Sequence, residues 1–162
     1  MRLALFQPDI PQNLGAAIRL CACLGVGLDV IEPCAFPLSD RSLKRAALDY
    51  GPKAELKLHP GWSAFLVAPE RKAGRLVLFT TRADARYIDF AFEPGDTLLF
   101  GRESAGVPEE VHAAADARVM IPLRPGLRSL NVATAAAMGL GEALRQTVAF
   151  PRSGRARTDP RP

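Results

Sequence analysis

The 162-residue chain is poor in the residues that build metal centres and disulfide frameworks. Its three cysteines, Cys21, Cys23 and Cys34, are odd in number and lack C-x-x-C spacing, and only His59 and His112 could join them as ligands. We therefore expect neither a zinc site nor disulfides. The cysteines are better explained as buried thiols in a reducing compartment, with Cys21 on the apolar face of a helix.

Long hydrophobic runs are absent as well. The apolar stretches are much shorter than the roughly 20 residues that cross a bilayer. The opening segment 1–6, MRLALF, is typical of a strand and not of a signal peptide, because Gln7, Pro8 and Asp9 interrupt it. These features predict a cytoplasmic protein that does not use a membrane.

Outside its C-terminal end, the chain has nearly equal numbers of positively and negatively charged residues. The net charge is +4, and residues 151–162 carry four arginines and one aspartate, which leaves residues 1–150 nearly neutral. We expect residues 1–150 to form a single domain and 151–162 a disordered basic tail. The tail is equally consistent with RNA binding and with simple solvation.

The phosphate-binding loops of nucleotide-dependent enzymes are also missing. Segment 98–108, LLFGRESAGVP, has the glycine spacing of a Walker A loop, but Val107 and Pro108 stand where Lys and Ser or Thr are required. The pattern G-x-G-x-x-G is absent, and Glu103 would repel a pyrophosphate. The loop therefore predicts a ligand that lies close to the backbone and is not strongly anionic.

The sequence does contain an alternation of short apolar runs with segments of helical spacing. This pattern predicts an α/β domain with a mainly parallel sheet flanked by helices. In the first helix, Asn13 is the expected N-cap and Gly25 the expected end. Strands are expected at 2–6, 28–31, 55–58, 75–80, 97–100 and 118–121, and helices near 14–24, 43–47, 62–66 and 130–147.

Three of the expected strand ends carry chemically unusual segments, at 80–82, 101–106 and 124–131. Because ligands of open sheets gather at the carboxyl ends of strands, we expect one pocket lined by all three. The last helix follows Ser129 and Asn131, either of which could cap it. Its many Ala, Gly and Thr residues predict close packing against another element, either a core of this domain or a second subunit.

Three separated motifs occur in the order of one known family. Segments 13–19 (NLGAAIR), 99–108 (LFGRESAGVP) and 121–138 (IPLRPGLRSLNVATAAAM) resemble the three motifs of SPOUT-class RNA 2′-O-ribose methyltransferases, the group that includes the TrmH-type enzymes. Within this group, segments 3–25 and 31–50 resemble the TrmL subfamily, which acts on the wobble nucleotide of tRNA. The resemblance covers residues 1 to about 150.

The resemblance implies a trefoil knot in the C-terminal half, a homodimer, and S-adenosylmethionine bound in the knot, with no metal. Such a cofactor carries a sulfonium cation and no phosphate, which agrees with the character of the glycine loop. The cofactor contacts implied by position are Phe79, Gly101, Ile121, Ser129, Leu130 and Asn131.

The resemblance also implies catalytic roles for Arg19, Asn13 and Glu103. Because a guanidinium stays protonated, Arg19 is a poor base. We expect it to hold the ribose-phosphate and the forming alkoxide, while an RNA phosphate takes the proton. Asn13 would fix Arg19 or the ribose, and Glu103 would orient Arg19, across the dimer. The plain alternatives are a helix cap at Asn13, a solvated Arg19 and a surface carboxylate at Glu103.

The implied reaction is methylation of the ribose 2′-oxygen of nucleotide 34, a cytidine or modified uridine, in the anticodon stem-loop of tRNA, leucine tRNAs in particular. Some TrmL relatives carry an aromatic residue just before Glu142 that could stack an anticodon base, and this chain has Gly141 there. The set of tRNAs therefore stays open. Alternatives are a TrmH-type enzyme of another tRNA or rRNA site, and an inactive knotted RNA-binding protein.

Overall fold

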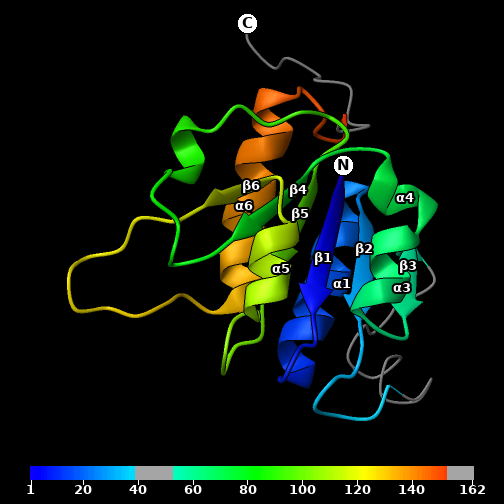
Figure 1. Cartoon of the computed structure of the whole chain (residues 1–162). Helices are drawn as coiled ribbons and strands as arrows, with labels where there is room; N and C mark the ends of the chain where they lie inside the picture. Colours follow the sequence, from blue (N-terminus) through cyan, green and yellow to red (C-terminus); the bar gives the residue numbers. More distant parts are fainter. Residues whose placement is uncertain (39–52, 153–162) are drawn as a thin grey trace, which may run out of the picture.

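The computed structural model describes residues 1–38 and 53–152, in which six parallel strands form one sheet of order β3-β2-β1-β5-β4-β6 (Figure 1). The α/β class predicted from the sequence is confirmed. The expected helix near 43–47 and the tail from residue 153 lie outside the described residues. The strands are β1 (Arg2–Phe6), β2 (Gly27–Ile31), β3 (Leu56–His59), β4 (Leu76–Phe79), β5 (Thr97–Phe100) and β6 (Ala117–Val119). The helices are α1 (Pro11–Leu24), α3 (Trp62–Val67), α4 (Pro69–Lys72), α5 (Glu109–Ala114) and α6 (Val132–Gln146), with a 3-10 turn η2 (Tyr87–Asp89).

Helices cover both faces of the sheet, which explains why β4 and β5 are buried along their whole length and β1 is buried from Leu3 to Phe6. Leu3 and Leu5 belong to a core formed with α1 and α6. Ala4 and Phe6 belong to a second core with α3 and α5. Alternate residues of one strand thus stabilise the two opposite layers.

The register of the strands brings the ends of β1, β4, β5 and β6 level with one another. Leu5 pairs with Phe100, and Phe79 pairs with both Phe100 and Val119. From β1 the chain builds outward to β2 and β3, and then places β5 and β4 on the other side of β1. The loops that leave these strands therefore meet beside the point where the strand order reverses, which is the usual ligand-binding edge of such sheets.

Helix α1 begins earlier than expected, so the prediction of Asn13 as its N-cap is wrong. Ile10 occupies the cap position and Pro11 the first turn, where the fixed φ of proline suits a helix and its missing N–H costs nothing. Asn13 is buried inside the first turn, and its side chain is used elsewhere. The predicted end is confirmed, because Gly25 adopts a left-handed φ of 65°.

Helix α6 is capped by Asn131, one of the two predicted candidates. The Asn131 side-chain oxygen accepts hydrogen bonds from the backbone N–H groups of Ala133, at 2.9 Å, and Thr134, at 3.2 Å. The small residues of α6 have a partner within the chain: a Cβ on Gly139 would lie 2.6 Å from Cζ of Phe79. Glycine at this position lets α6 approach the aromatic ring at the end of β4.

One buried charged group lies in the sheet away from that edge. Asp29 of β2 accepts hydrogen bonds from Arg2 Nε at 2.6 Å and contacts His59 Nε2 at 2.7 Å. In the described part of the chain, no group of three or more His, Cys, Asp or Glu side chains is placed to hold a metal. None of the described helices is long and apolar enough to cross a membrane. The expectation of buried cysteines is confirmed for Cys21, but Cys34 is half-buried and Cys23 is exposed. The trefoil knot stays a prediction.

Candidate functional site

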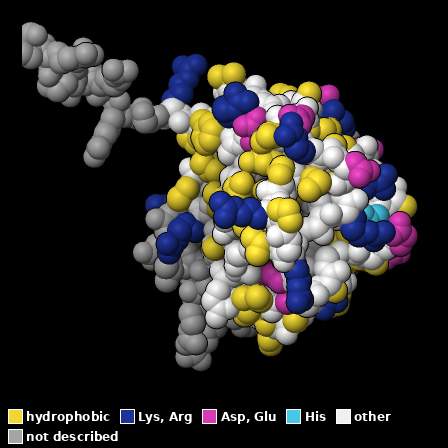
Figure 2. Space-filling view, turned by 90° about the vertical axis from the view of Figure 1, so that its left-hand side faces the viewer, with side chains coloured by type: hydrophobic (Ala, Val, Ile, Leu, Met, Phe, Trp, Pro, Cys, Tyr) yellow, Lys and Arg dark blue, Asp and Glu magenta, His cyan; other side chains and the backbone are white. Residues whose placement is uncertain are grey.

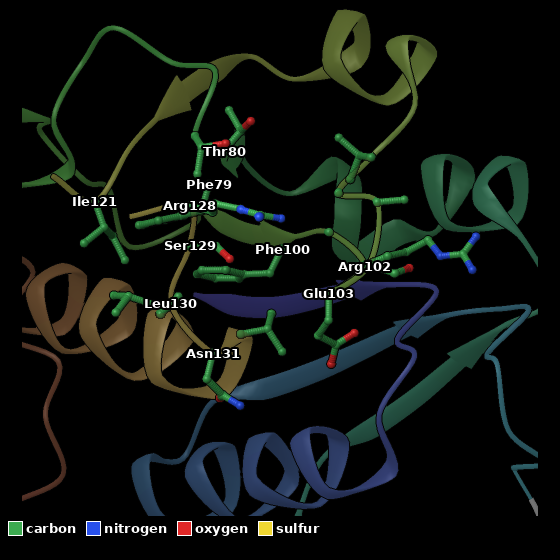
Figure 3. Close-up of a pocket in the computed structure, with 18 of the residues that line it drawn as sticks. Phe79, Thr80, Phe100, Arg102, Glu103, Ile121, Arg128, Ser129, Leu130 and Asn131 are labelled. Carbon is green, nitrogen blue, oxygen red and sulfur yellow. The ribbon is translucent and has the colours of Figure 1, made fainter. Parts of the chain in front are cut away.

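A pocket of about 680 Å³ opens at the carboxyl ends of β4 and β5 (Figure 3). The three segments singled out from the sequence, at 80–82, 101–106 and 124–131, all contribute to its lining, so the prediction of one shared pocket is confirmed. Phe79 and Phe100 lie in it with ring centroids 4.6 Å apart and planes 19° from parallel. Ile121, Leu123 and Leu130 extend this apolar part.

The glycine loop after β5 closes on itself. The backbone N–H of Arg102 donates to the Gly106 carbonyl, and the Gly106 N–H donates to the Arg102 carbonyl, both at 2.9 Å. A Cβ on Gly101 would lie 2.6 Å from the Gly106 carbonyl carbon, and Gly106 itself has a φ of 66°. Both glycines are therefore needed for the loop to lie flat along the pocket, where a ligand can approach its backbone.

A chain of hydrogen bonds joins the three sequence motifs at one side of the pocket. Glu103 Oε1 accepts from Asn13 Nδ2 at 2.8 Å, and Asn13 Oδ1 accepts from Asn131 Nδ2 at 2.8 Å. Because Asn131 also caps α6, the chain runs from the glycine loop through α1 to the start of the last helix. Only one amide orientation of Asn13 satisfies both neighbours, so the polar atoms here are held in place.

Asp9, in the loop between β1 and α1, fastens the glycine loop from the other side. Its carboxylate accepts from the Ser104 N–H at 3.0 Å, from Ser104 Oγ at 2.5 Å and from Arg102 Nη2 at 3.1 Å. The Asp9 N–H in turn donates to Glu103 Oε2 at 2.9 Å. The hydrogen bonds from Ser104, followed by those from Arg102, hold the pKa of Asp9 below its ordinary value.

We expect Asp9→Asn to lower the free energy of unfolding by about 1 to 3 kcal/mol at pH 7. Arg102 donates to one carboxylate oxygen and Ser104 to the other, and the amide nitrogen that replaces one of these oxygens cannot accept its bonds. Folding lowers the pKa of Asp9. The stabilisation that its ionised carboxylate gives the folded protein is therefore fully present above the ordinary pKa of 3.8 and is lost as the pH falls through the lowered value. Denaturant titrations of the parent and of Asp9→Asn, from pH 7 down to about pH 3, measure both unfolding free energies. The difference between the two should become smaller as the pH falls.

Asp89→Asn is the matched control, because Asp89 pairs with Arg86 on the surface and is 55% exposed there. Its unfolding free energy should stay within about 0.5 kcal/mol of the parent value. An Asp9→Asn protein as stable as this control would contradict the role given to Asp9.

The structure places every predicted site residue in the lining of the pocket except Arg19. Arg19 lies on α1 six residues after Asn13, so the two side chains leave the helix roughly 120° apart. Arg19 is exposed. Glu103, which was expected to orient Arg19, accepts hydrogen bonds from Asn13 and from the Asp9 N–H. Within one chain, Arg19 therefore does not reach the pocket.

Several pocket residues had no assigned role in the sequence analysis. Arg82 and Arg128 belong to segments flagged as unusual strand ends, and Arg102 adjoins a predicted site residue. His112 was considered only as a metal ligand, yet it is buried and lines the pocket. Burial, followed by the positive charge of Arg82, lowers the pKa of His112, which keeps its imidazole neutral at pH 7. Its position on α5 follows from tertiary packing and left no sequence signal.

The lining suits a ligand with an apolar part and a polar part of positive charge. The aromatic pair with Ile121 and Leu130 provides an apolar surface, while Asn13 and Glu103 present polar atoms nearby. Lysine is absent from the described lining, two of its three arginines are paired with carboxylates, and Glu103 opposes the binding of a phosphate next to it. The residues present thus fit an adenosyl sulfonium, with the carboxylate of Glu103 favouring the cation.

Sequence comparison also finds methyltransferases as the relatives of this chain. The model of the SpoU rRNA methylase family matches residues 1–141. A tRNA (cytidine(34)-2′-O)-methyltransferase of Beijerinckia indica is 60% identical over 148 residues, which are 91% of this chain and 92% of that protein. A protein of the same description from Ancylobacter novellus is 52% identical, over 95% of this chain and 98% of the relative.

Solved structures agree with the sequence relatives. One described as giving structural insights into the 2-OH methylation of C/U34 on tRNA superposes with a TM-score of 0.80 at 44% identity, over 90% of this chain and 89% of its own. The SpoU methyltransferase AviRb of Streptomyces viridochromogenes, in complex with AdoMet, gives a TM-score of 0.79 at 30% identity, over 90% of this chain and 60% of its own. With the motifs joined at one pocket and the family match spanning most of its length, the chain belongs to the SpoU rRNA methylase family.

Proposed function

We propose that this protein is an S-adenosylmethionine-dependent tRNA methyltransferase that methylates the ribose 2′-oxygen of nucleotide 34, a cytidine or modified uridine. The observation that carries the proposal is the hydrogen-bonded chain Glu103–Asn13–Asn131 beside a pocket that fits an adenosyl sulfonium. The relatives described as tRNA (cytidine(34)-2′-O)-methyltransferases, at up to 60% identity, support the choice of nucleotide.

Phe79, Gly101, Ile121, Ser129, Leu130 and Asn131 would hold the methyl donor, because all of them line the pocket. When bound, the donor supplies a methyl group on a good leaving group, so the protein has to supply orientation more than activation. Glu103 and Asn13 are fixed to each other by their own hydrogen bond and orient the ribose.

Arg19 would stabilise the negative charge that develops on the 2′-oxygen as the new O–C bond forms. A guanidinium stays protonated, so the ribose proton leaves to another acceptor, for which an RNA phosphate is available. Since Arg19 does not line the pocket of its own chain, we propose that it acts in the pocket of a second copy.

A homodimer is the assembly that such a shared site requires. Large hydrophobic side chains are exposed on the described surface, among them Leu127 at 66% and Met138 at 38%. Figure 2 shows hydrophobic side chains gathered on one face with Lys and Arg among them. Isologous contact of such a face would bury it in both copies.

We expect light scattering at micromolar concentration to give twice the mass of the 17.4 kDa chain. The physical reason is the burial of exposed apolar area, which stabilises association. A monomer mass over the whole micromolar range would contradict both the dimer and the shared site.

The anticodon stem-loop, leucine tRNAs as substrates and a cytoplasmic location remain parts of the proposal. Methylation of another tRNA or an rRNA position is the second candidate, because the matching family model is described for rRNA. Mass spectrometry of tRNA and rRNA nucleosides from a strain lacking the protein decides between the two. Loss of the 2′-O-methyl group at position 34 supports the first, and an unchanged position 34 with loss elsewhere supports the second.

A further inference from the structure

Three arginines line the pocket, each from a different strand-end segment: Arg82, Arg102 and Arg128. Two of them are held by carboxylates. Arg102 donates to Asp9 from both Nε and Nη2, and Arg82 Nη2 lies 3.1 Å from Glu109 Oε2. The carboxylates of Glu109 and Asp9 therefore largely compensate the positive charges of Arg82 and Arg102.

Arg128 differs from the other two. Within residues 1–38 and 53–152, no hydrogen bond or ion pair engages its guanidinium, and its side chain is exposed. In Figure 3, Arg128 extends from the segment before α6 toward the middle of the view, whereas the guanidinium of Arg102 points outward at the opposite side. An exposed cation at the pocket, whose donors are not used by the described residues, can bind an anion from outside the chain.

The cost of binding an anion is lowest at Arg128. Arg102 would have to leave Asp9, whose side chain is only 14% exposed and contacts no other cationic side chain among the described residues. Arg82 would have to leave Glu109, although that pair is exposed and weak. Arg128 gives up only water. The N-terminus of α6, four residues further on, adds positive potential at the same side.

We propose that Arg128 forms a phosphate-binding subsite at the mouth of the pocket, which takes a backbone phosphodiester of the RNA next to the methylated nucleotide. This inference rests on the proposed function. An exposed guanidinium suits an oxyanion that arrives from solvent on a macromolecule, and bidentate geometry suits a phosphate. The carboxylate of the methyl donor has the same chemistry and is the other source that the experiment has to separate.

The experiment compares Arg128→Gln with Arg124→Gln, in which an arginine four residues earlier is removed from the same exposed segment but not from the pocket lining. The RNA is an anticodon stem-loop, made with ordinary phosphates and with neutral methylphosphonates on either side of nucleotide 34. We measure its dissociation constant at several salt concentrations, the KM and kcat of methyl transfer, and the affinity for S-adenosylmethionine by calorimetry.

We expect Arg128→Gln to weaken binding of the ordinary RNA by about 10-fold and to reduce the slope of log affinity against log salt by about 0.7, the value for one phosphate of a single strand. KM for RNA should rise more than kcat falls, and cofactor affinity should stay unchanged. On the methylphosphonate RNA the difference between the variant and the parent should shrink to about 2-fold or less. Arg124→Gln should show less than about 3-fold loss on either RNA.

The inference would be overturned if Arg128→Gln and Arg124→Gln lost RNA affinity equally. It would also be overturned if the affinity loss of Arg128→Gln persisted on the methylphosphonate RNA. Either result would leave the proposed function standing. A drop in cofactor affinity in Arg128→Gln would assign the arginine to the donor's carboxylate and also overturn it. If the unmodified protein neither binds nor methylates the stem-loop, the proposed function itself fails, and the subsite fails with it.

Discussion

Replacing Arg19 with alanine is expected to lower the rate of methyl transfer by about 100-fold or more and to leave the affinity for S-adenosylmethionine unchanged. The magnitude is that of removing one preorganised group that stabilises developing negative charge. Cofactor affinity should survive because Arg19 is proposed to contact the ribose 2′-oxygen, whereas the residues proposed to hold the methyl donor all line the pocket of the other chain. Single-turnover kinetics with an anticodon stem-loop, together with calorimetry of the cofactor, measure the two quantities separately.

The same residue tests whether two copies share one site. Arg19→Ala and Glu103→Gln should each be inactive as homodimers. If Arg19 acts in the partner's pocket, a heterodimer of the two variants carries both defects in one site and none in the other. Co-expression in equal amounts should then restore about a quarter of the sites. Mixed protein as inactive as its components would place Arg19 and Glu103 in one chain's site and contradict the shared arrangement.

The second large effect is expected at the glycine loop. Gly101→Ala should reduce cofactor affinity by about 100-fold and the free energy of unfolding by about 1 to 3 kcal/mol. The added Cβ would lie 2.6 Å from the carbonyl carbon of Gly106, and backbone cannot move aside as a flexible side chain can. The loop has to open, which also displaces Glu103. Calorimetry with the cofactor and chemical denaturation measure the two effects.

Gly141→Ala is the matched control for this substitution. Gly141 lies within α6, and a Cβ there would have nothing within 4 Å. Alanine should therefore be neutral or stabilise the protein by up to about 1 kcal/mol, since it is the better helix former, and cofactor affinity should not change. Full cofactor affinity in Gly101→Ala would show that the closed loop is not needed to hold the ligand.

The open space around Gly141 also bears on the tRNA substrates. An added Cβ would meet nothing within 4 Å, so packing around a Cβ does not explain why glycine stands where some TrmL-like sequences are expected to carry an aromatic residue. The structure gives no account of this choice.

Much of the architecture could be predicted from local sequence. Strand β1 occupies the expected residues 2–6, and β5 the expected 97–100, because apolar runs bounded by turn residues leave little freedom in their ends. The end of α1 at Gly25 and the cap of α6 at Asn131 follow from single residues with strong positional preferences. The start of α1 was predicted too late. The fixed φ of Pro11 suits the first turn of the helix, so the helix begins before Asn13.

The members of the site were identified from three motifs, but their connections were not. Nothing in the sequence shows that Asn13 bonds to Glu103, 90 residues away, or that Asp9 clamps the glycine loop. Likewise, the ion pair between Arg2 and Asp29 and the contact of Asp29 with His59 join three strands that are far apart along the chain.

The sequence by itself determined the α/β class, which follows from periodicity and from the residue types of short segments. The resemblance to a known family predicted Asn13, Glu103 and the six cofactor contacts, all of which line the pocket. Only the tertiary structure decided that Arg19 lies outside the pocket of its own chain, that carboxylates compensate Arg82 and Arg102, and that none of the described carboxylates compensates Arg128. The physical reason is that the use of a charge depends on which partners the sheet order and the strand register bring within a few ångströms, and sequence spacing does not encode those distances.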